Sequence, residues 1–330
     1  MRTLTPVGIA GTGSFLPERV VTNDDFARTV DTSDEWIVKR TGIRERRFVS
    51  DDQQNSDLAI GAGQRALEAA GITAEELDLI VVGTLTADHL MPSVACQVQD
   101  KLGATKAGAF DVQSACTGFL TALHTAETFV AAGRAKNVLV IGTEALSRYL
   151  DMSDRTSCIL FGDGAGAAVV RPLEDCDGQG EILRTTLGSD GGGFEFIHIP
   201  HGGTKFPHNH AAYTASQHFI GLKGRDVYRF AVSKMSSLIT EMAAGHDPDE
   251  IGLIVPHQVN MRIIESAMDR VGWGMDRTYI NIDKYGNTSA ASVPIALDEA
   301  HRAGRLEKGK LVVMVAFGAG LTWGASLMRW

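Results

Sequence analysis

The stretch FDVQSACTGFLTALHTAETFVAAG (110–133) places a cysteine where two sequence patterns meet. A short apolar run precedes Cys116, and the residues after it have the spacing of a helix, with Phe119, Leu120 and Leu123 on one face. Small residues surround the cysteine itself. The stretch therefore predicts a strand, a tight turn, and a helix that begins beside Cys116.

The same order of patterns occurs twice in the chain. Apolar, β-branched runs lie in the first half at 77–84, 109–112, 137–145 and 166–172, and in the second half at 251–258, 279–283, 310–320 and 324–330. In each half a helix-like segment follows the second run and ends near a glycine, Gly133 or Gly304. This pattern favours mixed sheets with crossover helices. We therefore predict a duplicated α/β fold with two pseudo-twofold-related halves, 1–172 and 173–330.

Such a duplication predicts where a site lies. Equivalent strand ends come close together, and ligands of open α/β sheets bind beyond the carboxyl ends of the strands. Cys116 follows the second run of the first half, and GNTSAASVP (286–294) occupies the matching place in the second half. VPHQVN (255–260) ends one run, and FGAGLTWG (317–324) connects two others. We expect a cysteine, a histidine, an asparagine and a glycine-rich turn to meet in one cleft.

Composition narrows the class of protein. The 330 residues are 44% hydrophobic, and no apolar run approaches the roughly 18–20 residues of a membrane span. The N-terminus lacks the cleavage pattern of a signal peptide. A net charge of −9 argues against general nucleic-acid binding. The four cysteines show no paired spacing, which indicates a reducing, cytoplasmic environment: Cys96, Cys116, Cys158 and Cys176.

Three weaker patterns are open to more than one interpretation. GTGSFL (11–16) and GDGAGAAVV (162–170) contain glycines like those of dinucleotide sites, but neither opens a helix. The basic run KRTGIRERRF (39–48) is either a solvated face or a contact for an anionic ligand. A histidine-rich loop could hold zinc, although its glycines and prolines favour a polar surface loop; its candidate ligands are His198, His201, His208 and His210. We expect no metal and no cofactor.

Cys116 itself has two interpretations. A free cysteine is usually a small apolar side chain that fills the core. A helix N-terminus, however, carries partial positive charge, which lowers the pKa of a thiol and favours the nucleophilic thiolate. Partner groups elsewhere in the predicted cleft decide between the two.

Several motifs carry a resemblance to a known family. DTSDEWIVKRTGIRERRF (31–48), FDVQSACTGF (110–119), VPHQVNMRII (255–264), YGNTSAASVPIALDEA (285–300) and FGAGLTWGA (317–325) resemble β-ketoacyl-[acyl carrier protein] synthase III. That family initiates type II fatty-acid synthesis and belongs to the thiolase-like superfamily. The resemblance implies a homodimer that condenses an acyl-CoA primer with malonyl-[acyl carrier protein]. The products would be 3-ketoacyl-[acyl carrier protein], CoA and CO2.

The resemblance also implies roles for individual residues. Cys116 would carry the acyl group, His257 and Asn287 would stabilise the enolate, and the amides of Cys116 and Ala319 would form the oxyanion hole. The residues implied for CoA binding are Thr32, Trp36, Arg40, Arg155 and Asn260. Those implied for the carrier protein are Gln258, Arg262, Arg229 and Arg270, and those implied for the acyl pocket are Met91 and Phe317.

Three positions depart from the usual pattern of the family. Ala319 stands where a glycine is usual, and its N–H donates equally well provided that its φ is not strongly positive. Asp269 stands where a basic residue is common in the face that binds the acidic carrier protein. The molecule that accepts the primer could therefore be the usual carrier protein or another acceptor. Met91 replaces the phenylalanine of acetyl-preferring members. Because methionine is flexible, we predict medium-chain primers, the other interpretation being that Met91 packs at the dimer interface.

Other functions fit parts of the same pattern. A papain-like cysteine hydrolase has cysteine, histidine and asparagine in the same chain order, but its signature around the cysteine is absent and the duplication does not fit. A non-catalytic paralogue would not need the intact trio. A specialised condensing enzyme of secondary metabolism would share both the fold and the trio.

Overall fold

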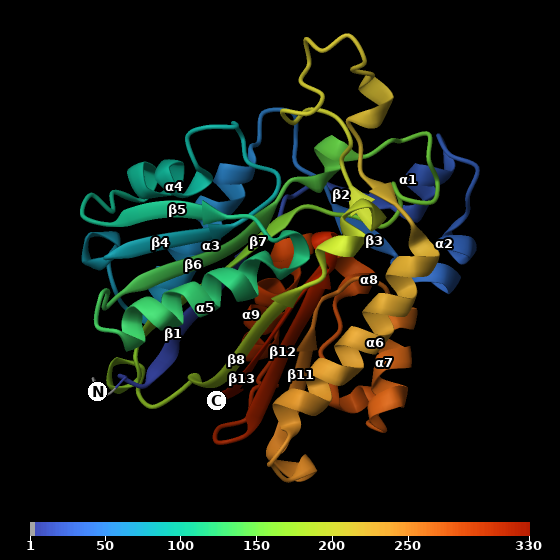
Figure 1. Cartoon of the computed structure of the whole chain (residues 1–330). Coiled ribbons are helices and arrows are strands. Elements are labelled where there is room, and N and C mark those ends of the chain that lie inside the picture. The colour runs from blue at the N-terminus through green and yellow to red at the C-terminus, as the bar shows by residue number, and fades with distance from the viewer. Residues whose placement is uncertain (1–3) are drawn as a thin grey trace.

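A nine-stranded mixed sheet forms the centre of the molecule (Figure 1). The computed structural model describes residues 4–330. The strands lie in the order β11-β12-β13-β8-β1-β7-β6-β4-β5. They are β1 (Val7–Phe15), β4 (Leu79–Gly83), β5 (Gly108–Val112), β6 (Val138–Glu144), β7 (Gly164–Pro172), β8 (Glu181–Ser189), β11 (Ile251–Pro256), β12 (Leu311–Gly318) and β13 (Thr322–Arg329). Two short pairs lie outside it: β2 (Val20–Thr22) with β3 (Glu45–Arg47), and β9 (Ile197–His198) with β10 (Gly221–Leu222).

The sheet repeats its own topology. From β1 outward, β7 and β6 pair antiparallel, and β6 pairs parallel with β4. From β8 outward, β13 and β12 pair antiparallel, and β12 pairs parallel with β11. The two sets meet where Gly8 of β1 pairs with Glu181 of β8. The predicted duplicated α/β fold is confirmed, and β1 and β8 add one strand to each half beyond the apolar runs of the predicted repeat. The division into domains after residue 172 stays a prediction.

One predicted strand is absent from its place. The apolar run 279–283 predicts a strand, but only the bridge between Ile254 and Thr278 forms next to it, and α8 (Ile282–Tyr285) follows. The backbone N–H groups of Asn281 and Ile282 donate instead to the side-chain oxygen of Gln258, at 3.1 and 3.2 Å. A buried side chain thus takes the hydrogen bonds that a neighbouring strand would have taken.

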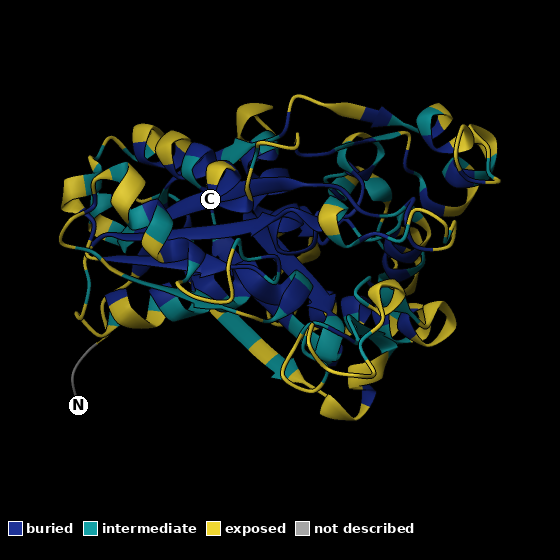
Figure 2. Cartoon of the chain, turned by 90° about the horizontal axis from the view of Figure 1, so that it is seen from above, coloured by how far each residue is buried: buried dark blue, intermediate teal, exposed yellow. Residues whose placement is uncertain are grey.

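Helices enclose the sheet in layers (Figure 1). The longer ones are α2 (Asp34–Thr41), α3 (Asn55–Ala70), α4 (Val94–Leu102), α5 (Gly118–Ala131), α6 (Gly224–Ala243), α7 (Met261–Val271) and α9 (Ser292–Arg302), and the short α1 spans Asn23–Ala27. Helix α3 packs on β1, β7 and β6, whereas α6 packs on β12 and β13. Helices α5 and α9 lie between the halves, since each contacts strands of both. Figure 2 shows this buried centre, with exposed residues on the outer helices.

The core follows the same layering. One apolar cluster contains side chains of both halves around α5 and α9, among them Phe119, Leu123 and Leu297. Separate clusters fill the outer faces beneath α3 and beneath α6. Gly133 and Gly304 follow the two central helices with φ of 65° and 68°, the left-handed conformation that glycine adopts freely. The predicted helix ends are confirmed.

A fourth cluster joins segments near the N-terminus to the end of the sheet, where the site lies. At its centre Arg46 is fully buried, with its guanidinium donating to the Asn23 side chain and to the carbonyl of Ile159. Burial lowers the pKa of Arg46 to about 10. The basic run 39–48 therefore contributes to the core as well as to the surface. Among the helices of residues 4–330, none has the length and apolarity required to cross a bilayer.

Candidate active site

Cys116 lies in a tight turn between β5 and α5. The 3₁₀ turn spans Ala115–Thr117, and Ala115 has a φ of 48°, a conformation that L-residues rarely adopt. A Cβ built on Gly318 would lie 2.8 Å from the Cβ of Cys116, so only glycine lets the two segments come this close. The predicted order of strand, turn and helix is confirmed, and the turn places the thiol at the beginning of α5.

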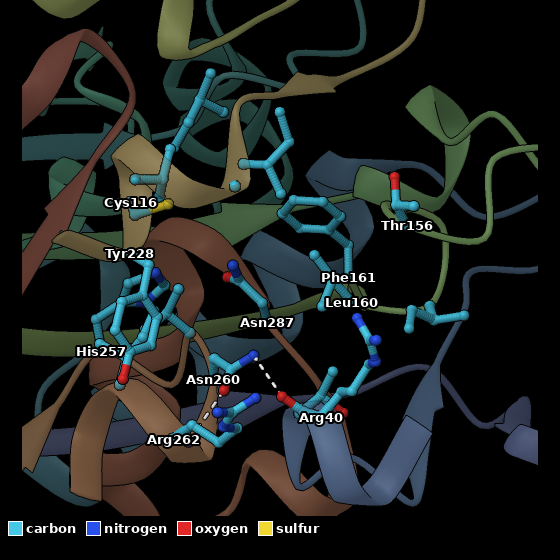
Figure 3. A pocket seen from close by; sticks show the side chains of 18 of the residues that line it. Arg40, Cys116, Thr156, Leu160, Phe161, Tyr228, His257, Asn260, Arg262 and Asn287 are labelled. Carbon is cyan, nitrogen blue, oxygen red and sulfur yellow. Dashed lines mark hydrogen bonds between the residues drawn. The ribbon is translucent and has the colours of Figure 1, made fainter. Parts of the chain in front are cut away.

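The second half contains the same turn before α9. It spans Ser289–Ala291, and Ser289 has a φ of 49°. Just before it, the side-chain oxygen of Asn287 accepts a hydrogen bond of 2.8 Å from the backbone N–H of Ser289. Because this bond holds the oxygen, the NH2 group of the same amide remains to donate into the cavity that Asn287 lines with Cys116 and His257 (Figure 3).

His257 is the first residue after β11. Its Nδ1 lies 2.6 Å from the hydroxyl oxygen of Ser292, which also accepts from the backbone N–H of Gln258 at 3.4 Å. The Ser292 hydrogen is therefore free to donate to Nδ1, and this arrangement places the ring hydrogen on Nε2. Nε2 is buried and has no partner among the described residues. Burial lowers the pKa of His257 to about 3, so the imidazole is a neutral hydrogen-bond donor.

A cavity of about 290 Å³ leads from the surface to these groups. Trp36 and Arg40 on α2 and Arg262 on α7 are not buried and line its mouth, while the buried His257 lines its base together with Cys116. Figure 3 shows Arg40 and Arg262 at the end of the cavity away from Cys116. The sequence prediction that a cysteine, a histidine, an asparagine and a glycine-rich turn meet in one cleft is confirmed in geometry.

A second cavity, of about 480 Å³, lies on the other side of Cys116. Ser289 and Ala319 line it near the thiol. The rest of its wall is mainly apolar: Leu85, Leu146, Phe161, Phe194, Ile197, Ile199 and Ile220. The nucleophile thus lies where a passage to the surface meets a space suited to an apolar chain.

The environment of Cys116 is electrostatically unlike the one that the sequence predicts. Burial raises the pKa of its thiol to about 12, and the Glu144 carboxylate acts in the same direction, whereas the Ser289 hydroxyl opposes them. The helix N-terminus alone would lower the pKa of this thiol, but loss of solvation outweighs it. Attack by Cys116 therefore requires an acceptor for the thiol proton.

The implied CoA residues gather around Trp36. The guanidinium of Arg40 lies 4.4 Å from the centre of the indole ring, and that of Arg155 lies 5.3 Å from it. Arg155 also forms a 2.8 Å ion pair with the exposed Asp31. Asn260 caps α7 and donates to the backbone oxygen of Arg40 (Figure 3). Thr32, on the same side, has a buried hydroxyl without a partner among the described residues.

The implied carrier residues separate into two groups. Gln258 is buried, and its amide donates to the carbonyls of Pro256 and Tyr279 besides accepting from the 281–282 backbone. It cannot reach a carrier protein, and we do not retain it. Arg262 and Arg229 are exposed on α7 and α6 near the mouth of the cavity. Arg270 is exposed at the far end of α7, about 12 Å along the helix from Arg262.

The remaining residues have mixed positions. Ala319 lies beside Cys116, and its φ is not positive, which meets the condition for its amide to donate. Phe317 lines the first cavity, with its ring 5.7 Å from that of His257, and does not line the second. Met91 is 83% exposed before α4 and lines neither cavity within a single chain.

The histidine-rich loop offers no metal site. In residues 4–330, no group of three or more His, Cys, Asp or Glu side chains is arranged to hold an ion. Its rings pack on one another instead: His201 lies 4.6 Å from Phe206, and His208 lies 4.7 Å from Tyr213. The glycine motifs at 11–16 and 162–170 fall largely within β1 and β7, so neither begins a helix that could bind a dinucleotide.

Sequence reasoning missed two polar residues beside the nucleophile, Glu144 at the end of β6 and Ser289 in the second turn. For Glu144, the position of a carboxylate at the end of an apolar run could have indicated a functional residue. Its burial could not be predicted, because it depends on segments distant in the chain.

Comparisons with known proteins agree with this geometry. Family models described as 3-Oxoacyl-[acyl-carrier-protein (ACP)] synthase III match residues 110–191 and, for the C-terminal part, 242–330. The β-ketoacyl-[acyl-carrier-protein] synthase III of Caldanaerobacter subterraneus subsp. tengcongensis is 50% identical over 98% of this chain and 97% of its own.

Solved structures show the same similarity. The 3-oxoacyl-[acyl-carrier-protein] synthase III of Aquifex aeolicus superposes with a TM-score of 0.89 and 44% identity, covering 98% of this chain and 100% of that one. The priming β-ketosynthase of the R1128 polyketide pathway superposes with a TM-score of 0.91 and 35% identity, covering 100% of this chain and 98% of that one.

Proposed function

The chain belongs to the β-ketoacyl-[acyl-carrier-protein] synthase III family, the acyl-transferring condensing enzymes of fatty-acid synthesis, and we propose that Cys116 carries its acyl intermediate. The observation that supports this most strongly is the meeting of two cavities at Cys116, with the buried and unpartnered Nε2 of His257 in one of them. A thiol between a polar passage and an apolar space can receive an acyl group from one side and hold its chain on the other.

In the first step Cys116 attacks the carbonyl of an acyl-CoA. The new carbon–sulfur bond forms as the bond to CoA breaks, and CoA leaves as its thiolate. The amides of Cys116 and Ala319 stabilise the tetrahedral oxyanion between these events. Trp36, Arg40 and Arg155 hold the remote adenine and phosphate groups, although an adenine that stacks on Trp36 must displace a guanidinium from that ring.

In the second step malonyl-carrier protein loses CO2. The electron pair of the broken carbon–carbon bond forms an enolate, whose oxygen accepts hydrogen bonds from His257 Nε2 and the Asn287 amide. A neutral imidazole suits this role, because a cationic one would protonate the carbanion before condensation. Burial and the bond to Ser292 keep His257 neutral, with the hydrogen on the correct nitrogen.

In the third step the enolate carbon attacks the thioester of acyl-Cys116. The 3-ketoacyl product remains on the carrier protein, and the cysteine leaves as a thiolate that must regain its proton. Arg262 lines the mouth of the cavity, and the exposed Arg229 follows Tyr228 of its wall, so both are basic groups that would meet an acidic carrier protein.

We propose medium-chain primers for the same site. The second cavity offers about 480 Å³ with a mainly apolar wall, more than an acetyl group fills. Each additional buried CH2 group contributes roughly 0.8 kcal/mol of binding free energy. Met91 is exposed in one chain, and in the proposed homodimer it would close the partner's acyl tunnel.

We propose that the enzyme is cytoplasmic, because the spacing of its four cysteines indicates a reducing environment.

The test is a matrix of acyl-CoA primers from acetyl to dodecanoyl against malonyl-carrier protein and malonyl-CoA, with products identified by mass and CO2 counted. We expect one CO2 per 3-ketoacyl product, and a rate that rises beyond acetyl. Met91→Phe should shift the profile towards acetyl. Thioester hydrolysis without CO2 would contradict the function, and a profile peaking at acetyl in both proteins would contradict the primer.

A second candidate is a priming enzyme of secondary metabolism. The similarity to the R1128 priming β-ketosynthase supports it, since that structure superposes over the whole chain. The same matrix of substrates decides between the two candidate functions. If the carrier protein of fatty-acid synthesis fails as acceptor while another carrier protein is used, the enzyme of secondary metabolism is favoured.

A further inference from the structure

A fully buried carboxylate lies behind the nucleophile and has no role in the steps above. Glu144 is the last residue of β6 and is 0% exposed. Four groups donate to it: the hydroxyls of Thr86 and Thr84 at 2.5 and 3.3 Å, the backbone N–H of Leu85 at 3.3 Å, and the hydroxyl of Ser289 at 3.2 Å. No basic side chain of residues 4–330 pairs with it.

Ser289 contacts this carboxylate and lines the same cavity as the thiol. Its hydroxyl donates to Glu144 at 3.2 Å and lines the second cavity together with Cys116, where it acts to lower the pKa of the thiol. The other two hydroxyls have accepting roles elsewhere, because Thr86 accepts from Ala145 N–H and Thr84 accepts from Asn55. Among the described hydroxyls that donate to Glu144, only that of Ser289 belongs to a residue lining the cavity beside Cys116.

His257 is a poor acceptor for the thiol proton. The bond to Ser292 occupies Nδ1, and the same bond places the ring hydrogen on Nε2, the nitrogen that faces the cavity. Burial further disfavours the imidazolium. Burial also raises the pKa of Glu144 to about 7, so this carboxylate can hold a proton near neutral pH.

We propose that Glu144 accepts the thiol proton of Cys116 through the Ser289 hydroxyl as Cys116 attacks the primer, and returns it when the condensed product leaves. The proposal rests on the proposed role of Cys116 as acyl carrier. During acylation, the S–H proton passes to the Ser289 oxygen while the Ser289 proton passes to Glu144. The CoA thiolate takes its proton from solvent. After condensation, the Cys116 thiolate recovers the stored proton by the reverse path, so every proton is accounted for.

Storage of the proton also helps the second step. While the acyl group occupies Cys116, Glu144 is neutral, and no buried anion opposes the enolate that forms nearby. The titratable groups that interact with Glu144 are Cys116 and Tyr149, and burial, followed by the charges of Glu144 and Asp88, raises the pKa of Tyr149. Tyr149 stays neutral across the working range, so Glu144 alone should titrate near pH 7 in this network.

The test is the rate of acyl-Cys116 formation with one acyl-CoA, followed by rapid quench and intact mass from pH 5 to 9. In the wild type, the rate should rise with pH through about 7 as Glu144 ionises, then level. Glu144→Gln and Ser289→Ala should each slow acylation, on the order of 10²-fold, and lose this rise. The double variant should be no slower than either, since both interrupt one path.

Two features keep the test decisive. Ser289→Ala retains the backbone N–H that holds Asn287, so decarboxylation should remain while acylation falls. Thr143→Val is the matched control, because the hydroxyl of Thr143, which precedes Glu144 in β6, donates to Asn55 and not to the Glu144 carboxylate. Slow variants that keep the wild-type pH dependence would show a structural role and overturn the proposal, as would wild-type rates. A wild type that never acylates at Cys116 would instead contradict the proposed function.

Discussion

The turns that begin α5 and α9 have the same backbone and different chemistry. Ala115 and Ser289 open them with φ of 48° and 49°, and each turn leads into a helix between the two halves. The first turn then presents Cys116, whereas the second presents Ala290 at the equivalent place. Its polar groups are Ser289 and, two residues earlier, Asn287.

The strand ends differ in the same way. Thr84 follows β4 in the first half, and His257 follows the equivalent β11 in the second. The duplicated fold thus supplies one frame twice, and the two copies divide the proposed chemistry: the first holds the nucleophile, and the second holds the donors for the enolate. If this division is correct, variants in the two halves should affect different steps.

The largest effect should come from Cys116→Ser. A hydroxyl is a far weaker nucleophile than a thiolate, so acyl-enzyme should be undetectable by intact mass after incubation with acyl-CoA. The fold should survive, because the change is nearly isosteric. Acylation of this variant at another residue with the rate of the wild type would contradict the assignment of Cys116 as the nucleophile.

His257→Ala and Asn287→Ala should follow. Each removes one donor to the enolate, and such a loss typically lowers a rate on the order of 10²–10³-fold. Release of labelled CO2 from malonyl-carrier protein measures this step. Acyl-enzyme formation serves as the internal control and should change little. A variant that releases CO2 like the wild type would show that its residue has no part in the second step.

Trp36→Ala should have a smaller effect, confined to substrate binding. Loss of the stacking surface should raise KM for acyl-CoA roughly tenfold with little change in kcat, since Trp36 holds a remote part of the substrate. Arg229→Ala is a useful comparison, because it should alter KM for malonyl-carrier protein instead. The assignment of Trp36 to CoA binding fails if Trp36→Ala raises only the KM for malonyl-carrier protein.

The smallest effect concerns pH. His257 has a pKa of about 3 against an ordinary value of 6.5, so its imidazole stays neutral and donating as pH falls from 7 to 5. Decarboxylation by Cys116→Ala, which lacks the thiol, should not slow across this range. A loss of rate with a midpoint near 6.5 would mean that His257 titrates normally and is solvated.

The sequence could predict the site because its positions follow from topology. Cys116, His257 and Asn287 each stand directly after an apolar run or at the beginning of a helix, and equivalent strand ends meet in a duplicated sheet. Gly133 and Gly304, which follow α5 and α9, could be predicted as helix ends for the same reason. These features depend on local pattern and on one symmetry, both of which are present in the chain.

Burial was harder to predict, because it depends on distant segments. Gln258 follows His257, and its sequence position is typical of a polar surface residue. Its side-chain amide is instead hydrogen-bonded to backbone groups of residues 279–282. Glu144 reads as the solvated end of a strand, but Thr84, Thr86 and Ser289 enclose it. The same enclosure raises the pKa of Cys116, which the helix N-terminus alone would lower.

One chase experiment tests the division of labour directly. His257→Ala is incubated with acyl-CoA, freed of excess substrate, and then mixed with malonyl-carrier protein, while intact mass follows Cys116. We predict that the acyl-enzyme forms at close to the wild-type rate, persists through the chase and yields no 3-ketoacyl product. Failure of this variant to acylate, or discharge of its acyl group onto the carrier at the wild-type rate, would contradict the separation of the two steps between the two halves.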